Sequence, residues 1–180
     1  MPDRRTRMLD AALAIVGESG TRGLTHRGID RRLEVPDGST SNYFRTRRSL
    51  LVGTMERLQE VDQATLTEIH RGFKKIDDVG LAAALAEFAV RQCRPSAITR
   101  ARARFALTLV FPERLGGTLR AWLKLGVANL GHANPDALTR ALLAYTEGVI
   151  YQAILDTGGK GTELDRDEVA CHALTLIRGV

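Results

Sequence analysis

The sequence is poor in several residue types, and each shortage excludes a class of protein. Only 2 of its 180 residues are cysteine, which excludes a small secreted scaffold held by disulfides. Cys93 and Cys171 lie far apart, without the short spacing of metal ligands, so we expect two buried, reduced thiols. No apolar run reaches about 18 residues, so no membrane span is expected. The polar start of the chain does not resemble a signal peptide, and we expect a cytoplasmic protein.

Motifs of catalysis are also missing. The sequence contains no Walker loop, no dinucleotide-binding fingerprint, no His-Glu-x-x-His and no Gly-x-Ser-x-Gly. His70, His132 and His172 lie apart from one another and from carboxylates at ligand spacing, so surface or packing roles are expected for them. We therefore expect no enzyme, no cofactor and no metal.

Helix-forming residues dominate what remains. Ala and Leu are abundant, aromatic residues make up 5% of the chain, and Val and Ile are comparatively sparse. Apolar residues recur at helical spacing throughout, which predicts an all-α chain of about nine helices without a strand. The expected helices run from the N-terminus to Gly20 or Gly23, then over 25–33, up to Phe44, 46–72, 79–92, 98–111, through Trp122 to about 130, 136–156 and 165–178.

Positive charge is concentrated at the N-terminus. The formal net charge is +5, and residues 1–50 hold ten arginines against six acidic residues, a net of +4. Residues 51–180 hold sixteen basic and fifteen acidic residues, a net of +1. Proteins that bind phosphate backbones have such clusters, because Lys and Arg displace condensed counterions from nucleic acid.

Residues 24–51 carry the most informative pattern. Two short helices, separated by a tight turn at Val35-Pro36-Asp37-Gly38, are what a helix-turn-helix requires. The second helix must be slim at its start to enter a major groove about 12 Å wide. Residues 38–42, Gly-Ser-Thr-Ser-Asn, are small and polar, and Val35 and Phe44 would anchor that helix to the core.

This segment resembles the DNA-binding domain of the TetR family of bacterial repressors. The matching positions, in order and spacing, are Leu24-Thr25, Val35, Gly38, Ser39, Tyr43-Phe44, Arg47 and Leu50-Leu51. The match covers residues 4–52. Glu34 stands where the family usually has glycine, so the turn must tolerate a Cβ atom there. Thr40 and Ser41 replace a common apolar-Tyr pair, which removes one familiar phosphate contact.

The resemblance and the residue types suggest DNA contacts. Thr25, His26 and Arg27 open the first short helix and would hold a phosphate. Asp37, Ser39, Ser41 and Asn42 would face base edges, since Asn can bind adenine bidentately. Tyr43 and Arg47 would contact the DNA backbone, and Gly38 completes the set. Alternatives stay open: His26 as a surface residue, Asp37 as a helix cap, and Arg4, Arg5 and Arg7 as either a solvated end or a basic arm.

The two C-terminal helices are more apolar than a monomer surface allows. Small residues on one face of 136–156 would let another helix approach closely. The resemblance implies that both helices pair with a second subunit, which would place two DNA-binding domains on a palindromic site. The alternative is a purely intrachain core. The expected interface residues are Ala137, Ala141, Ala144, Gly148, Leu155, Ala173 and Leu176.

The middle helices could enclose a ligand pocket of apolar, aromatic and a few polar side chains. In the family, a ligand there would shift the long fourth helix and separate the two DNA-binding domains. The alternative for each candidate is plain core packing. The candidates are Phe88, Arg91, Phe105, Leu109, Trp122 and Tyr151.

The sequence as a whole predicts a helix-turn-helix domain over 1–48 and an all-helical regulatory and dimerisation domain over 49–180. The expected function is that of a homodimeric, ligand-released repressor of double-stranded DNA at a palindromic operator, with a small-molecule effector. The alternatives are a constitutive DNA-binding protein without a ligand and an enzyme.

Overall fold

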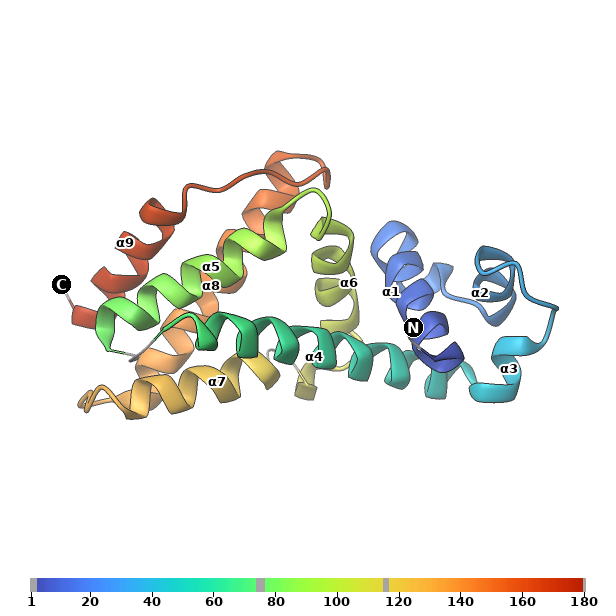
Figure 1. The fold of residues 1–180 in the computed structure, drawn as a ribbon, viewed down its shortest axis with the longest axis horizontal. Coiled ribbons are helices and arrows are strands. Elements are labelled where there is room, and N and C mark those ends of the chain that lie inside the picture. Colours follow the sequence, from blue (N-terminus) through green and yellow to red (C-terminus); the bar gives the residue numbers. More distant parts are fainter. Residues whose placement is uncertain (1–2, 74–76, 115–116, 180) are drawn as a thin grey trace. The chain divides into compact units, whose positions relative to one another are not determined.

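The computed structural model describes residues 3–73, 77–114 and 117–179, and these residues form helices without any strand. Figure 1 shows the order of the elements along the chain. The α-helices are α1 (Arg4–Gly23), α2 (His26–Arg32), α3 (Ser39–Tyr43), α4 (Arg47–Arg71), α5 (Asp78–Cys93), α6 (Ile98–Thr108), α7 (Gly117–Ala128), α8 (Pro135–Asp156) and α9 (Arg166–Arg178). A short 3-10 helix spans Pro112–Arg114. The all-α prediction is confirmed.

The chain divides into two compact units. The first comprises residues 1–61 and 99–115, and the second comprises 62–98 and 116–180. The helix α4 therefore contributes its first part to one unit and its second part to the other, while α6 belongs with the N-terminal helices. The functional division of the chain at residue 48 stays a prediction.

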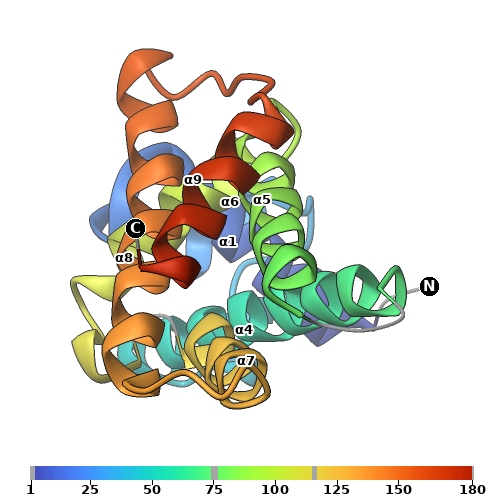
Figure 2. The same cartoon turned by 90° about the vertical axis from the view of Figure 1, so that its left-hand side faces the viewer.

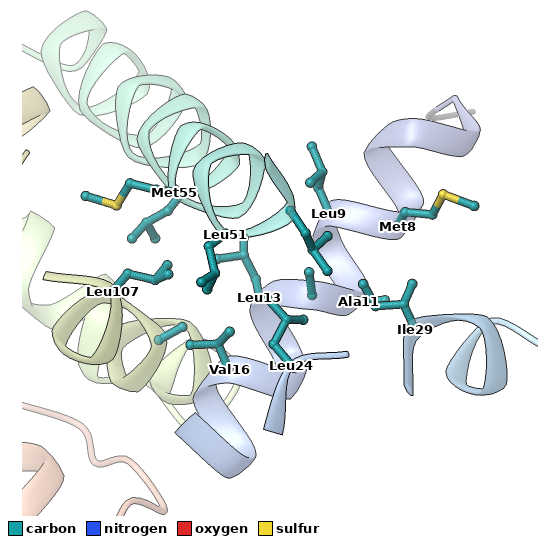
Figure 3. Packing of buried hydrophobic residues seen from close by; sticks show 14 of the residues in the cluster. Met8, Leu9, Ala11, Leu13, Val16, Leu24, Ile29, Leu51, Met55 and Leu107 are labelled. Atoms are coloured by element: carbon teal, nitrogen blue, oxygen red, sulfur yellow. The ribbon is translucent and has the colours of Figure 1, made fainter. Parts of the chain in front are cut away.

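The first unit is held by a core of aliphatic side chains. Leu9, Leu13 and Val16 of α1 lie toward Leu51 and Met55 of α4 and Leu107 of α6, as Figure 3 shows, and Met8 belongs to the same buried cluster. These side chains are at most 8% exposed, so their burial supplies the main stabilisation of the unit. Two ion pairs join helices at its edge: Arg32 of α2 binds Glu18 of α1, and Arg57 of α4 binds Asp10 of α1.

The second unit is built around α5. The residues of α5 from Leu81 to Cys93 are mostly buried, and α9 packs along α5, with α8 beside both (Figure 2). The guanidinium of Arg91 on α5 forms ion pairs with Glu68 of α4 and Glu87 of α5. The carboxylate of Glu87 also lies 3.7 Å from Arg166 of α9. This network ties three helices of the unit at its surface.

Several local predictions can be compared with the structure. Thr25, Asp77 and Asn134 directly precede helices, close to the expected starts at 25, 79 and 136, and each side chain accepts a hydrogen bond from a first-turn N–H group. The prediction of two buried thiols is half wrong: Cys93 is buried, but Cys171 lies exposed on α9. Among the described residues, no helix is both long and apolar enough to cross a membrane.

Candidate nucleic-acid interface

The start of α2 is fixed by Thr25, directly before it, and by its first residue, His26. The hydroxyl of Thr25 accepts a hydrogen bond from the N–H of Gly28 at 3.0 Å, so Thr25 caps the helix. The ring of His26 is half-buried, and its Nε2 lies 2.6 Å from the carbonyl oxygen of Phe44. Since a carbonyl only accepts, this nitrogen must carry the proton. His26 therefore joins the start of α2 to the end of α3 and is not an ordinary surface residue.

The turn between α2 and α3 contains two residues in the left-handed region. Glu34 has φ 53° and is the one non-glycine residue with positive φ among the described residues. Gly38 has φ 90° and occupies the N-cap position of α3. A Cβ atom at φ near +60° is close to the following carbonyl oxygen, which is why glycine favours such positions. The turn tolerates a Cβ atom at Glu34, as the sequence requires.

Asp30 is a residue of this site that the sequence analysis missed. Its side chain is fully buried on α2. One carboxylate oxygen accepts from the N–H of Gly38 at 2.9 Å, and the other accepts from the N–H and the hydroxyl of Thr40 at 2.8 and 2.6 Å. Burial alone raises the pKa of Asp30, but the hydrogen bonds from Thr40 and Gly38 outweigh it, and the pKa lies below its ordinary value. The sequence signal that could have indicated Asp30 is Thr40, a polar residue at a position where the TetR family commonly has an apolar one.

The polar residues of α3 are presented outward. Ser41, Asn42 and Tyr43 are exposed, whereas Thr40 is buried against α2 and anchors the helix. Ser39 is half-buried, and its hydroxyl oxygen accepts a hydrogen bond from the guanidinium of Arg4 at 3.2 Å. The exposed side chains offer hydroxyl and amide groups at the tip of a helix of only five residues, which is the chemistry that reads base edges.

The arginines of this unit divide into two groups. The first group makes contacts within the protein. The guanidinium of Arg47 donates to the backbone carbonyls of Leu24 and Thr21 and so holds the loop before α2. Arg5 lies over the ring of Phe44, 5.5 Å from its centroid. The second group is exposed and supplies positive charge at the surface near α2 and α3: Arg27, Arg31, Arg45 and Arg48. Asp37, a predicted base-contacting residue, is exposed as well.

The predicted dimer residues fall into three classes. Ala141, Ala144, Gly148 and Leu155 are exposed on one face of α8, and Leu176 is exposed on α9. Ala137 is half-buried. Ala173 has no exposed surface, because it is buried within its own chain on α9, which packs against α5 and α8. We therefore leave Ala173 out of any contact with a second molecule.

The predicted pocket residues are not gathered in one cavity. The second unit has a cavity of about 260 Å³ lined by residues of α4 and α7 and by Asn129, directly after α7. Of the six candidates, its lining includes Trp122. Phe88 is fully buried as a core residue, and Arg91 is engaged in the ion pairs described above. Phe105 is half-buried, while Leu109 is 85% and Tyr151 49% exposed. The cavity lining is Gln63, Leu66, Thr67, His70, Trp122, Leu125, Gly126 and Asn129.

Known proteins resemble this chain in sequence and in structure. No protein-family model matches it. The HTH-type transcriptional regulator BetI of Serratia proteamaculans (strain 568) is 42% identical over 57 residues, which cover 32% of this chain and 29% of that protein. The match therefore spans less than a third of the curated relative.

Solved structures match over nearly the full length. A member of the TetR family from Streptomyces coelicolor A3 has a TM-score of 0.75 at 24% identity, with 97% of this chain and 98% of that chain covered. The multidrug binding protein EbrR, complexed with malachite green, has a TM-score of 0.76 at 23% identity and the same coverage. A transcriptional regulator from Rhodococcus sp. Rha1 has a TM-score of 0.72 at 21% identity, covering 98% and 95%.

These structural neighbours and the helix order confirm the resemblance predicted from residues 24–51, and the chain has the fold of the TetR family of transcriptional regulators.

Proposed function

We propose that this protein is a sequence-specific DNA-binding transcriptional regulator that acts as a dimer on a palindromic operator and is released from it by a small molecule. The observation that carries the proposal is the outward presentation of Ser41, Asn42 and Tyr43 on α3, directly after a turn held by buried hydrogen bonds. The similarity to TetR-family regulators supports it. Such a protein would act where the DNA is, in the cytoplasm.

Contacts to phosphates and contacts to base edges would have different roles in DNA binding. The exposed arginines beside α2 and α3 would bind phosphates, and this attraction carries no sequence information. Ser41 and Asn42 would read base edges in the major groove. The hydroxyl of Thr25 still has a proton to donate to a phosphate oxygen, since it only accepts within the α2 cap.

Selection of binding sites from random duplex DNA at about 0.15 M salt tests the function directly, because phosphate attraction alone is weak there. We expect an enriched palindrome. Asn42→Ala should lower affinity for the selected site by about 1–3 kcal/mol and relax the preference at one base pair. Folded protein that enriches no sequence would refute sequence-specific binding.

The charge contribution can be tested separately. Arg48→Gln removes a positive charge beside α3 and should reduce the slope of log affinity against log salt by about one. Arg71→Gln removes the same charge from the exposed end of α4 and is the matched control, for which the slope should not change. Equal slopes for both variants would remove Arg48 from the interface.

The effector site we favour is the cavity of α4 and α7. No acid, lysine or arginine belongs to its described lining; four apolar residues, three neutral polar residues and His70 form it. A charged ligand would find no acid, lysine or arginine of opposite charge in this lining. We therefore expect a neutral, largely apolar ligand with a few hydrogen-bonding groups. Such a ligand would differ in charge from malachite green, the cationic dye in the EbrR complex.

A neutral fluorescent probe, N-phenyl-1-naphthylamine, tests this cavity. Its fluorescence should rise on saturable binding to the wild-type protein, and Trp122→Ala should weaken the binding. Leu109→Ala is the control, because Leu109 is exposed and does not line the cavity. Loss of binding in Leu109→Ala but not in Trp122→Ala would place the ligand elsewhere.

A further inference from the structure

The helix α3 is capped in an unusual way. Six other helices are each capped by the side chain of the residue directly before them: Asp3, Thr25, Thr46, Asp77, Asn134 and Asp165. At α3 the corresponding residue is Gly38, which has no side chain to accept a hydrogen bond. The carboxylate of Asp30, on the preceding helix, binds the free N–H groups of Gly38 and Thr40 in its place.

A helix of five residues depends strongly on such a cap. The first N–H groups of any helix lack intrahelical partners, and a single turn is unfavourable by itself because nucleation fixes many dihedral angles for few hydrogen bonds. The two N–H groups bound by Asp30 lie at the start of α3, and the Thr40 hydroxyl adds a third bond from inside the helix. Asp30 thus fixes where α3 begins and how it is turned against α2.

We propose that Asp30 is a positioning residue for DNA recognition, which holds the start of α3 so that Ser41 and Asn42 are presented to base edges in a fixed orientation. The proposal rests on the proposed function, but the hydrogen bonds that carry it belong to the protein without DNA. Asp30 would contact no base and no phosphate, because its side chain is fully buried.

The chemistry of the contact predicts which substitutions matter. Both carboxylate oxygens accept hydrogen bonds, so Asp30→Asn would turn an N–H₂ group toward an N–H donor and lose at least one bond. Thr40→Val keeps the shape of the side chain and removes only the hydroxyl donor. Thr40→Ser keeps the donor and is the matched control, since it should restore what Thr40→Val loses.

The first readout is discrimination between DNA sequences. For each variant, at a temperature where circular dichroism shows it fully folded, we would measure affinity for the selected operator and for a scrambled duplex. Asp30→Asn should lower the ratio of the two affinities by about tenfold or more, and Thr40→Val should lower it less. Thr40→Ser should match the wild type. Affinity for the scrambled duplex should hardly change, because phosphate contacts need less exact placement.

The second readout does not involve DNA. Amide hydrogen exchange followed by NMR should show slow exchange at Gly38 and Thr40 in the wild type. Exchange over residues 38–43 should become fast in Asp30→Asn and should rise less in Thr40→Val, while the α1 core stays protected.

Each outcome decides one proposal. If the wild type binds operator and scrambled duplex equally, the proposed function is refuted. In that case amide hydrogen exchange over residues 38–43 alone tests whether Asp30 holds the start of α3. If folded Asp30→Asn keeps the wild-type ratio, or keeps slow exchange over 38–43, the positioning role of Asp30 is refuted. A lower melting temperature with an unchanged ratio would mean that Asp30 serves stability only. Should Asp30→Asn fail to fold, Thr40→Val supplies the same comparison.

Discussion

Glu34 occupies a backbone conformation that suits glycine, with φ 53°. The left-handed conformation is unfavourable by about 1–2 kcal/mol for a residue with a Cβ atom, and glycine loses about 0.5–1 kcal/mol through its greater freedom when unfolded. Glu34→Gly should therefore stabilise the protein by about 0.5–1 kcal/mol, measured by urea unfolding. Glu34→Ala keeps the Cβ atom and should gain nothing. A gain in Glu34→Ala equal to that in Glu34→Gly would place the effect in the charge of the side chain.

The lowered pKa of Asp30 predicts how stability depends on pH. Because the pKa of Asp30 is lower in the folded protein, its ordinary value being 3.8, the ionised carboxylate stabilises the fold above that value. This contribution is lost as the pH falls through the folded pKa. Urea midpoints of wild type and Asp30→Asn should therefore differ at pH 6, and the difference should shrink as the pH falls below the ordinary pKa of 3.8. Asp37→Asn, at an exposed site in the same turn, is the control. A difference that persists unchanged at low pH would contradict the prediction.

At the scale of whole elements, α1 and α6 approach closely at a glycine. A Cβ atom added to Gly17 of α1 would lie 1.9 Å from the backbone carbonyl oxygen of Thr99 of α6, and backbone cannot move aside cheaply. Gly17→Ala should destabilise the protein by about 1–3 kcal/mol or more, although alanine favours helices. Ser19→Ala, at an exposed position of the same helix, should change little. Thermal unfolding would compare them, and a Gly17→Ala variant as stable as wild type would refute the close approach.

Elements with local signals were predictable from the sequence. Thr25, Asp77 and Asn134 each accept from an N–H group three residues further along, so neighbouring residues of the sequence suffice to recognise these helix starts. Asp30 could not be found in this way, because its partners lie on another helix and only the folded turn brings them together. The expected end of α1 at Gly20 or Gly23 reflects a local feature: Gly20 has φ 69° and kinks the helix, which then continues to Gly23.

Pocket and surface positions were harder to predict, because apolar residues look alike in a sequence. Phe88 and Trp122 both lie on apolar helix faces, yet one fills the core and the other lines a cavity. Tyr151 was assigned to a pocket, but the structure places it on the exposed face of α8 that also carries Ala144 and Gly148. Packing in three dimensions decides between these outcomes, and periodicity only limits them.

At the scale of the whole molecule, the exposed face of α8 needs an explanation. Tyr151 and Leu155 are 49% and 54% exposed, and Ala141, Ala144 and Gly148 continue the same face at spacings of three and four residues. A Cβ atom at Gly148 would meet nothing within 4 Å, so packing within the chain does not require glycine there. Small residues flanked by larger apolar ones allow close approach of another helix. We propose that this face, with Leu176 of α9, pairs with its copy in a twofold dimer.

Gly148→Arg tests this pairing, because a long charged side chain at the centre of a twofold interface would meet its own copy. We expect wild-type protein to sediment as a dimer at micromolar concentration and Gly148→Arg as a monomer. Affinity for a palindrome should then fall by about 100-fold or more, since two linked contacts become one, while affinity for a half-site should stay unchanged. Ala121→Arg on exposed α7 is the matched control and should remain dimeric. A dimeric Gly148→Arg that binds the palindrome like wild type would remove α8 from the interface, whereas a monomeric wild type would refute the dimer itself and leave each DNA-binding unit to act alone.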